Sequence, residues 1–312
     1  IDKSDAADDE MIINNKAIQH LSIVTNADNN KPFKLINVAN SSLHKLYVVE
    51  TSMEQRTLKK VILNENIDTL TIGGYISRGD VPQQSVELVG LSRLNRLKRL
   101  SYNPDFSPIA TKDLPKNIEG LYIGGSGNVP YKDGDSFDYS HLSKLKIYSN
   151  GKFISANMKL STAIDSIYLF PSQVFGDLKE LDFSSLKFTK ADIYIGWLTR
   201  NDVELPILKR FVFPATLRQL KLSNAQSEVV DLSRCTHLKD LYVDDSRTGE
   251  RAIKKLILPK NLKKSDFKRQ HKSEFENDYA FKLADISNET VIENLPSWVE
   301  NDGNGTYSVP ND

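Results

Sequence analysis

The stretch that decides the fold is Ile67-Asp68-Thr69-Leu70-Thr71-Ile72, in which apolar residues occupy the first, fourth and sixth positions. The alternation of apolar and polar residues at its end predicts a β-strand with one buried face. The same spacing, Leu-x-x-Leu-x-Leu in relaxed form, recurs along the chain. The fourth positions of its eleven copies are Leu21, Leu46, Leu70, Leu100, Leu121, Leu145, Ile167, Ala191, Leu220, Leu241 and Ser265.

A second apolar stretch precedes most copies by about nine residues, as Val61-Ile62-Leu63 precedes Leu70. It is usually followed by Asn, Ser or Pro, which are turn-forming residues. Each repeat of about 24 residues therefore predicts two short strands joined by a corner, and then a variable return segment. Because one such unit cannot bury its apolar face alone, we expect the units to stack on one another.

The expected fold is a mainly β repeat protein, a solenoid of about 11 coils of about 24 residues with two short strands in each coil. The solenoid is predicted to span 11–294, with an irregular capping coil at its C-terminal end. A polar N-terminal tail, 1–10, and a polar C-terminal tail, 295–312, fall outside the repeat. No internal linker interrupts the pattern, so the sequence predicts one domain.

The repeats resemble those of the leucine-rich-repeat superfamily, whose signature is the Leu-x-x-Leu-x-Leu segment, over about residues 11–267. Three segments resemble the bacterial BspA-like, or Treponema-type, subclass: Phe211-Val212-Phe213-Pro214-Ala215-Thr216-Leu217, Leu256-Ile257-Leu258-Pro259-Lys260-Asn261-Leu262, and Ser233-Arg234-Cys235-Thr236-His237-Leu238. The resemblance implies a binding scaffold, because members of the superfamily are adhesins, host-cell ligands, receptors or secreted effectors.

Composition excludes several classes of function. The 41 basic and 41 acidic side chains cancel, which argues against a nucleic-acid binder, since such proteins normally carry a basic excess. With 39% hydrophobic and 26% charged residues the chain is an ordinary globular one. No apolar run approaches the length of a transmembrane helix, so we expect no membrane insertion. The chain opens at Ile1 and continues into an acidic stretch, which fits an exported bacterial protein, secreted or at the cell surface.

The predicted binding face follows from the strands. Residues on either side of a buried leucine point outward, so they form an exposed lane on the stacked sheet. Large aromatic residues on that lane are the informative feature, since tyrosine is enriched at interface hot spots. The alternative is that tyrosine is there for its β-propensity alone. The candidate binding residues are Tyr47, Tyr122, Lys144, Lys146, Tyr148, Tyr168, Phe170, Lys190, Tyr194 and Tyr242.

The lane is also modestly basic, although the whole chain is neutral. The lane carries eight basic and four acidic residues, and the excess of positive charge falls in the N-terminal and central copies. The basic residues are Lys45, Arg99, Lys144, Lys146, Lys190, Lys221, Lys264 and Lys268, and the acidic ones are Asp192, Asp240, Asp244 and Asp266.

Signals for catalysis are weak. The five histidines make no metal-binding spacing, and neither a nucleophile elbow nor a phosphate-binding loop occurs. Cys235 stands alone and occupies a repeat position that should be buried, so it reads as a core residue rather than a nucleophile. We therefore expect a protein that is not an enzyme and that binds no metal or cofactor.

The sequence thus favours a non-catalytic protein-binding module of an exported bacterial leucine-rich-repeat protein, of the adhesin or host-interaction type. Its partner is expected to be a protein, with a host protein as one candidate, and to bind on the exposed strand lane. Two alternatives stay open: the targeting module of a secreted effector, and a surface protein that binds glycans through its tyrosines.

Overall fold

The fold is described from a computed structural model, which covers residues 9–26, 33–52, 56–76, 85–125, 131–195, 207–225, 227–245, 252–267 and 280–309. Most of the regular structure is β-strand, as the alternation of apolar residues predicted. The helical elements in the described ranges are short 3-10 turns, and no helix among them is long and apolar enough to cross a membrane. The chain divides into two compact units, Ile1–Lys152 and Phe153–Asp312.

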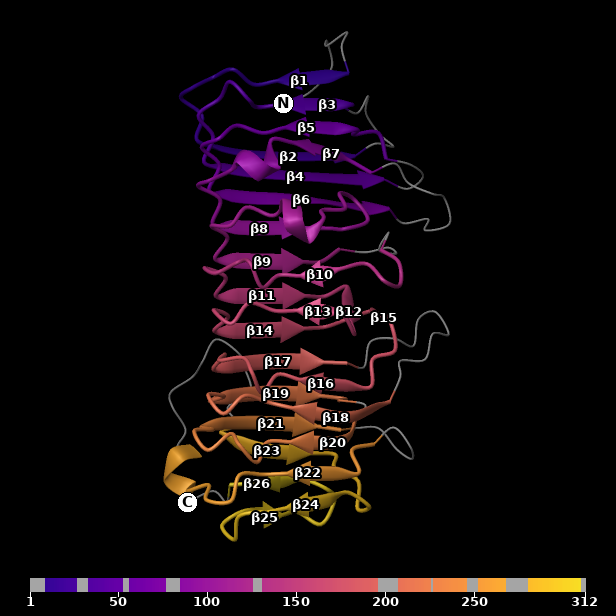
Figure 1. Cartoon of the computed structure of the whole chain (residues 1–312), viewed down its shortest axis with the longest axis vertical. Coiled ribbons are helices and arrows are strands. Elements are labelled where there is room, and N and C mark those ends of the chain that lie inside the picture. The colour runs from indigo at the N-terminus through magenta and orange to yellow at the C-terminus, as the bar shows by residue number, and fades with distance from the viewer. Residues whose placement is uncertain are drawn as a thin grey trace. The chain divides into compact units, whose positions relative to one another are not determined.

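The first unit contains two sets of parallel strands. Within each set, neighbouring strands are in chain order (Figure 1). One set runs β1 (Glu10–Ile12), β3 (Leu35–Asn37), β5 (Lys60–Ile62) and β7 (Glu87–Val89). The other runs β2 (His20–Asn26), β4 (Lys45–Ser52), β6 (Thr69–Ile76), β8 (Arg99–Tyr102), β9 (Gly120–Ile123) and β11 (Ile147–Asn150). The short strand β10 (Phe137–Asp138) precedes β11, as β7 precedes β8, and the 3-10 turns η1 (Leu91–Arg93) and η2 (Thr111–Asp113) lie between the strands.

The repeat leucines of this unit meet in register. Leu46 pairs with Leu70, Leu70 with Leu100, and Leu100 with Leu121. All four of these leucines are buried. Because side chains alternate between the two faces of a strand, this register puts the repeated leucines of neighbouring strands on the same side of the sheet.

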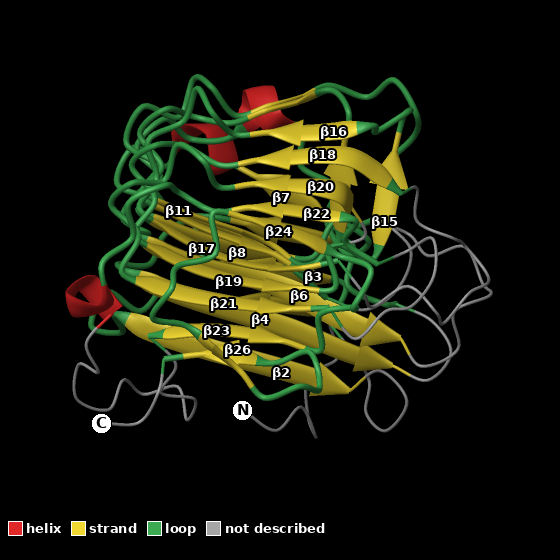
Figure 2. Ribbon diagram, turned by 90° about the horizontal axis from the view of Figure 1, so that it is seen from below, coloured by secondary structure: helices red, strands yellow, loops and turns green. Residues whose placement is uncertain are grey.

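The second unit has the same two-strand arrangement, and Figure 2 shows its two sets of strands as separate layers. One set runs β14 (Ser166–Leu169), β17 (Lys190–Tyr194), β19 (Gln219–Ser223), β21 (Asp240–Asp244) and β23 (Phe281–Ala284). The other runs β16 (Glu180–Asp182), β18 (Leu208–Val212), β20 (Ser227–Asp231), β22 (Lys255–Ile257) and β24 (Val291–Glu293). The small pair β12 (Phe153–Ser155) and β15 (Gln173–Phe175) and the strand β13 (Met158–Lys159) complete the unit.

The C-terminal edge of this unit is closed by antiparallel strands. β26 (Tyr307–Ser308) pairs antiparallel with β23, and β25 (Glu300–Asn301) pairs with β26. The segment predicted as a polar tail thus supplies two short strands. A sheet edge covered in this way no longer offers its backbone hydrogen-bonding groups to another chain.

The corner after the second strand of many repeats is closed by an Asp or Asn side chain. The side-chain oxygen accepts the backbone N–H two residues on, as Asp138 does from Ser140 at 2.9 Å and Asp231 from Ser233 at 3.0 Å. Such Asx turns stop the strand because they replace its ladder hydrogen bonds by local ones. The same bond is made by Asn37, Asn64 and Asp182.

The repeat frame predicted around Leu145 was wrong. Tyr148, rather than Leu145, pairs with Leu121, because the backbone N–H groups of Lys146 and Ile147 both donate to the carbonyl of Glu119. Leu145 is also buried, but it occupies the preceding apolar position of the repeat, three residues before Tyr148 and before β11 begins.

The copy predicted at Ser265 was also wrong. Ser265 lies in a 3-10 turn, η5 (Lys264–Phe267), and the strand that pairs with β21 is β23, with Phe281 opposite Leu241. The charged stretch around Ser265 lacks the alternation of a half-buried strand, whereas Phe281-Lys282-Leu283 has it.

Candidate functional site: the exposed strand face

The second unit carries a row of large polar and aromatic side chains across its longer sheet. Tyr168, Asp192, Lys221, Tyr242 and Lys282 are paired successively from β14 to β23. Lys221 is exposed and the other four are half-buried. They point away from the core because their neighbours along each strand, such as Ile193 and Leu222, point into it.

Side-chain contacts order this row. The ammonium of Lys190 lies 5.8 Å from the ring centroid of Tyr168, within the range of a cation–π interaction. The hydroxyl of Tyr242 donates to Oδ2 of Asp244 at 3.4 Å. Such contacts hold the rings and charges in place before any partner arrives, which lowers the entropy cost of binding.

Five of the predicted binding residues lie together in this unit. Tyr168 and Lys190 belong to the row and its contacts, and Phe170, 36% exposed, directly follows β14. Tyr194 ends β17 and pairs with Ser223, which in turn pairs with Asp244. Tyr242 completes the group on β21. We name the face formed by Tyr168, Phe170, Lys190, Asp192, Tyr194, Lys221, Asp240, Tyr242 and Asp244 the strand face.

Three carboxylates of the strand face were predicted as lane charges but not as binding residues. Burial raises the pKa of Asp192, of Asp244, and of Asp240, the last to about 6. The positive charge of Lys190 opposes the rise in the pKa of Asp240, the charges of Lys221 and Lys190 oppose it at Asp192, and the charge of Asp285 adds to it at Asp244. An alignment of the copies of the repeat would have identified Asp192 as a binding residue, because it occupies the same repeat position as Tyr168, Lys221 and Tyr242.

In the first unit the predicted residues are farther apart along the sheet. Tyr47 on β4 is 41% exposed, and Tyr122 on β9 is half-buried, with β6 and β8 between their strands. Tyr122 is covered by Arg99, whose guanidinium carbon lies 5.6 Å from the ring centroid and whose Nη2 donates to the phenol oxygen at 3.4 Å.

Three predicted binding residues are not on the exposed strand positions. Tyr148 is fully buried, because the shifted frame turns it inward opposite Leu121. Lys144 and Lys146 are exposed but precede β11, so they lie off the strand. The outward positions of β11 are taken by Ile147 and Ser149 instead. The basic character assigned to this part of the lane was therefore wrong.

The lane charges predicted near the C-terminal end also change. Lys264 and Asp266 lie in η5 rather than on a strand, and Lys268 lies outside the described residues. The described part of the second unit therefore presents a mixture of three basic and three acidic residues on this face: Lys190, Asp192, Lys221, Asp240, Asp244 and Lys282. This is a charge-alternating surface rather than a basic one.

Metal-ligating clusters and the single thiol of the described residues bear on the sequence prediction. No group of three or more His, Cys, Asp or Glu in the described ranges could hold a metal ion. Cys235 is fully buried, its Sγ lies 3.4 Å from the carbonyl oxygen of Pro214, and burial raises its pKa to about 12. A thiol with so high a pKa is a poor nucleophile at neutral pH.

Comparison with known proteins adds no relative: no protein-family model, no curated protein and no solved structure matches the chain.

Proposed function

We propose that this chain is a leucine-rich-repeat solenoid of the bacterial, exported type, and that it binds a protein partner on its strand face without catalysing a reaction. The in-register pairing of the repeat leucines within each unit supports the repeat assignment. So does the recurrence of a second strand, which precedes β2, β4, β6 and β8 in the first unit and β17, β19, β21 and β23 in the second. The biological role that we propose is that of an adhesin or of a protein that interacts with a host.

One observation carries the binding proposal: Tyr168, Asp192, Lys221 and Tyr242 lie opposite one another on four adjacent strands and are partly exposed. Tyrosine offers a large amphipathic contact area at a low cost in side-chain entropy. The charges between the two tyrosines give a partner its orientation, because like charges brought opposite each other are penalised. A rigid parallel sheet underneath holds the row in one geometry.

The alternation of charges favours a protein partner over a glycan. An acidic and a basic group between two aromatic rings match the mixed side chains of a protein surface. A neutral glycan would stack on the rings and leave the Lys221 ammonium and the Asp192 carboxylate without charged partners. A partner that covers this row must therefore bring complementary charges.

A matched pair of charge reversals tests the proposal. Lys221 on β19 and Lys209 on β18 are both exposed lysines of the second unit, but only Lys221 belongs to the strand face. The wild type, Lys221→Glu and Lys209→Glu proteins are immobilised and incubated with candidate host extracts, and captured proteins are quantified by mass spectrometry. We expect a captured protein that the Lys209→Glu variant retains and the Lys221→Glu variant loses.

The double variant Tyr168→Ala/Tyr242→Ala should lose the same protein. Equal capture by all four proteins would contradict the strand face as the binding site. A glycan array probed with the same variants checks the alternative. If the tyrosine substitutions abolish glycan binding and Lys221→Glu leaves it unchanged, the ligand of the strand face is a carbohydrate and not a protein.

A further inference from the structure

The turns that lead into three neighbouring strands of the first unit form a second exposed surface, separate from the strand face of the second unit. These turns, 94–98, 115–119 and 142–146, precede β8, β9 and β11, whose N-terminal ends lie in neighbouring rows (Figure 1). They carry five exposed basic side chains and one half-buried acidic side chain, Glu119. We name the surface formed by Arg96, Lys98, Lys116, Lys144 and Lys146 the turn face.

The same backbone hydrogen bond closes all three turns and points these side chains outward. In each turn the carbonyl of a buried residue accepts the N–H of another buried residue three positions later. The pairs are Leu94 and Leu97 at 3.1 Å, Pro115 and Ile118 at 3.4 Å, and Leu142 and Leu145 at 3.0 Å. Because the two ends of each turn are anchored in the core, the residues between them face the solvent.

Further hydrogen bonds tie the three turns to one another. The carbonyl of Lys98 accepts the N–H of Glu119 at 2.8 Å, and the carbonyl of Glu119 accepts the N–H of Lys146 at 2.8 Å. Nδ2 of Asn117 donates to the carbonyl of Asn95 at 2.7 Å. Since neighbouring strands lie about 4.8 Å apart, the first and third turns stand about 10 Å apart with the second between them. The turn face is therefore a preorganised row of positive charge.

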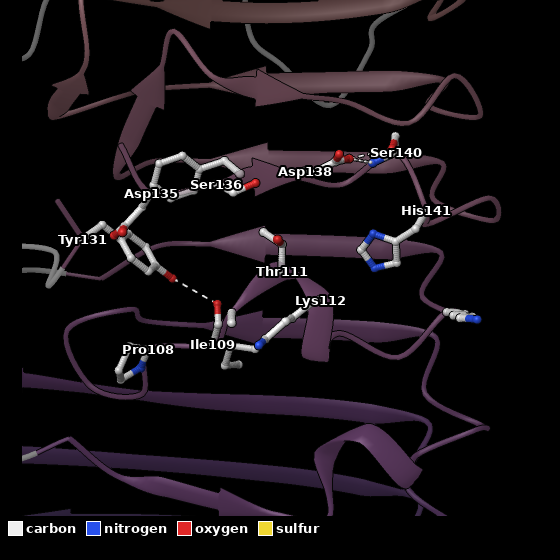
Figure 3. A pocket seen from close by; sticks show the side chains of 13 residues that line it. Pro108, Ile109, Thr111, Lys112, Tyr131, Asp135, Ser136, Asp138, Ser140 and His141 are labelled. Carbon is white, nitrogen blue, oxygen red and sulfur yellow. Dashed lines mark hydrogen bonds between the residues drawn. The ribbon is translucent and has the colours of Figure 1, made fainter. Parts of the chain in front are cut away.

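No acidic side chain among the described residues neutralises this row. None of its five cations forms an ion pair there. The repeat before it carries Glu65 and Asp68, and Oδ2 of Asp68 lies 3.4 Å from Nδ1 of His44. Asp138, ahead of the third turn, accepts the N–H and the hydroxyl of Ser140 at 2.9 and 2.5 Å (Figure 3). The positive charge thus stays uncompensated on three turns of a chain whose net charge is zero.

Lys112 and Asp113, which lie in η2 ahead of the second turn, add no net charge to the turn face. Figure 3 shows the Lys112 ammonium beside Ile109, at a surface concavity of about 800 Å³ that Tyr131 and Phe137 also line. We therefore do not count Lys112 as part of the turn face.

The neighbours of the cations favour a sulfated sugar among polyanions. Asn95 and Ser143, which precede Arg96 and Lys144, are exposed, and their side chains form no hydrogen bond within the described ranges. Amide and hydroxyl groups bond to sugar hydroxyls, while the cations bond to anionic groups. The three turns contain no aromatic side chain on which nucleic-acid bases could stack. They also contain no large exposed apolar residue that could enter a membrane.

We propose that the turn face binds a short sulfated oligosaccharide that lies across the three turns. Its anionic groups contact Arg96, Lys116 and Lys144, one in each turn, and its hydroxyls bond to the side chains of Asn95 and Ser143. Glu65 and Asp68 of the preceding repeat repel an anion and end the site on that side. This binding requires neither the strand face nor its protein partner.

The test uses a heparin tetrasaccharide and the same tetrasaccharide with its sulfates removed. Binding to the full chain is measured by isothermal titration calorimetry at a series of sodium chloride concentrations. We expect the desulfated probe to bind at least about tenfold more weakly, because it loses charge-assisted bonds. The logarithm of the affinity for the sulfated probe should fall linearly with the logarithm of the salt concentration.

Two triple variants with the same net charge assign the site. Arg96→Gln/Lys116→Gln/Lys144→Gln removes one cation from each turn, and we expect it to lower the affinity by about tenfold or more and the salt slope by about two. The matched control removes three exposed lysines of the same unit that lie outside the turn face: Lys16→Gln/Lys59→Gln/Lys132→Gln. It should bind as the wild type does.

The variant Lys221→Glu, altered on the strand face, should also bind the sulfated probe as the wild type does, so the two proposals fail independently. A loss in the control as large as in the turn-face variant would overturn the proposal, because net charge alone would then drive binding. No binding of the sulfated tetrasaccharide would overturn it as well. A short single-stranded DNA and phosphatidylserine vesicles are compared at the same salt concentration. Tighter binding of either one would replace the sugar by a nucleic acid or by a membrane.

Discussion

The carboxylate of Asp245 accepts the backbone N–H of Ile253 at 2.6 Å, and both residues are almost completely buried. The same device occurs in the first unit, where the buried carboxylate of Glu50 accepts the N–H of Leu58 at 3.1 Å. In each case the acid stands at or near the end of a strand, β21 or β4, and reaches a residue eight positions later. Each buried acid thus ties the end of its strand to a backbone N–H group eight residues later in the sequence.

Replacing Asp245 by alanine should destabilise the second unit. The substitution leaves the buried N–H of Ile253 without its acceptor, which costs about 1–3 kcal/mol of the free energy of unfolding. Asp245→Asn keeps an acceptor oxygen and should lose less. Urea denaturation gives the change, and hydrogen exchange at the Ile253 amide locates it. Unchanged exchange at Ile253 in Asp245→Ala would show that this bond does not hold the segment.

Nitration by tetranitromethane should separate the exposed from the buried tyrosines. The reagent attacks the phenolate, and burial raises the pKa of Tyr102, Tyr139 and Tyr148. Tyr47, which is 41% exposed, should therefore be modified at mildly alkaline pH while those three are spared. Peptide mapping by mass spectrometry measures the result. Modification of Tyr148 as fast as Tyr47 would restore the outward position that the sequence predicted for it.

The repeat strands could be predicted from sequence because apolar residues must recur at fixed spacing for stacked strands to share a core. That rule placed Leu46, Leu70, Leu100 and Leu121 correctly opposite one another. It failed near Tyr148 because Leu142, Leu145 and Ile147 match the pattern fully, whereas the frame in the structure, Leu145, Tyr148 and Asn150, ends on a polar residue. The choice between them is made by backbone hydrogen bonds to Glu119, which the side-chain pattern does not encode.

The candidate sites were predicted in unequal measure. The aromatic part of the strand face followed from strand alternation, since Tyr168 and Tyr242 fall at outward positions of recognisable copies. The concave surface that Tyr131 and Phe137 line was not predicted, because Tyr131 lies outside the recurring apolar spacing, and the spacing assigned Phe137 only to a short strand. Periodicity identifies the residues that are repeated, and it does not say which of them border a surface concavity.

The pKa of Asp240 predicts a pH dependence of stability. Burial raises this pKa from 3.8 to about 6 in the folded state, against the effect of Lys190. Between these two values the folded chain binds more protons than the unfolded chain, so this residue makes stability fall as pH rises through the interval. Asp240→Asn should remove that contribution and flatten the dependence of the urea midpoint on pH there. Carboxyl ¹³C shifts measure the pKa directly, and a value near 3.8 would contradict the burial.

Gly74 on β6 is a position where the packing of the first unit leaves no room for a side chain. A Cβ at this position would lie 2.3 Å from Cδ2 of Phe106, whose ring is fully buried, and 2.8 Å from the carbonyl oxygen of Glu50 on the paired strand. Neither neighbour can withdraw, since one is packed in the core and the other is backbone. Gly74→Ala should therefore lower the free energy of unfolding by about 1–3 kcal/mol through overpacking. Gly124→Ala is the matched control, because a Cβ there meets no atom within 4 Å, and it should change stability by less than about 0.5 kcal/mol. Urea denaturation of the two variants beside the wild type measures both effects. Equal stability of Gly74→Ala and Gly124→Ala would mean that the Phe106 ring is not seated on β6.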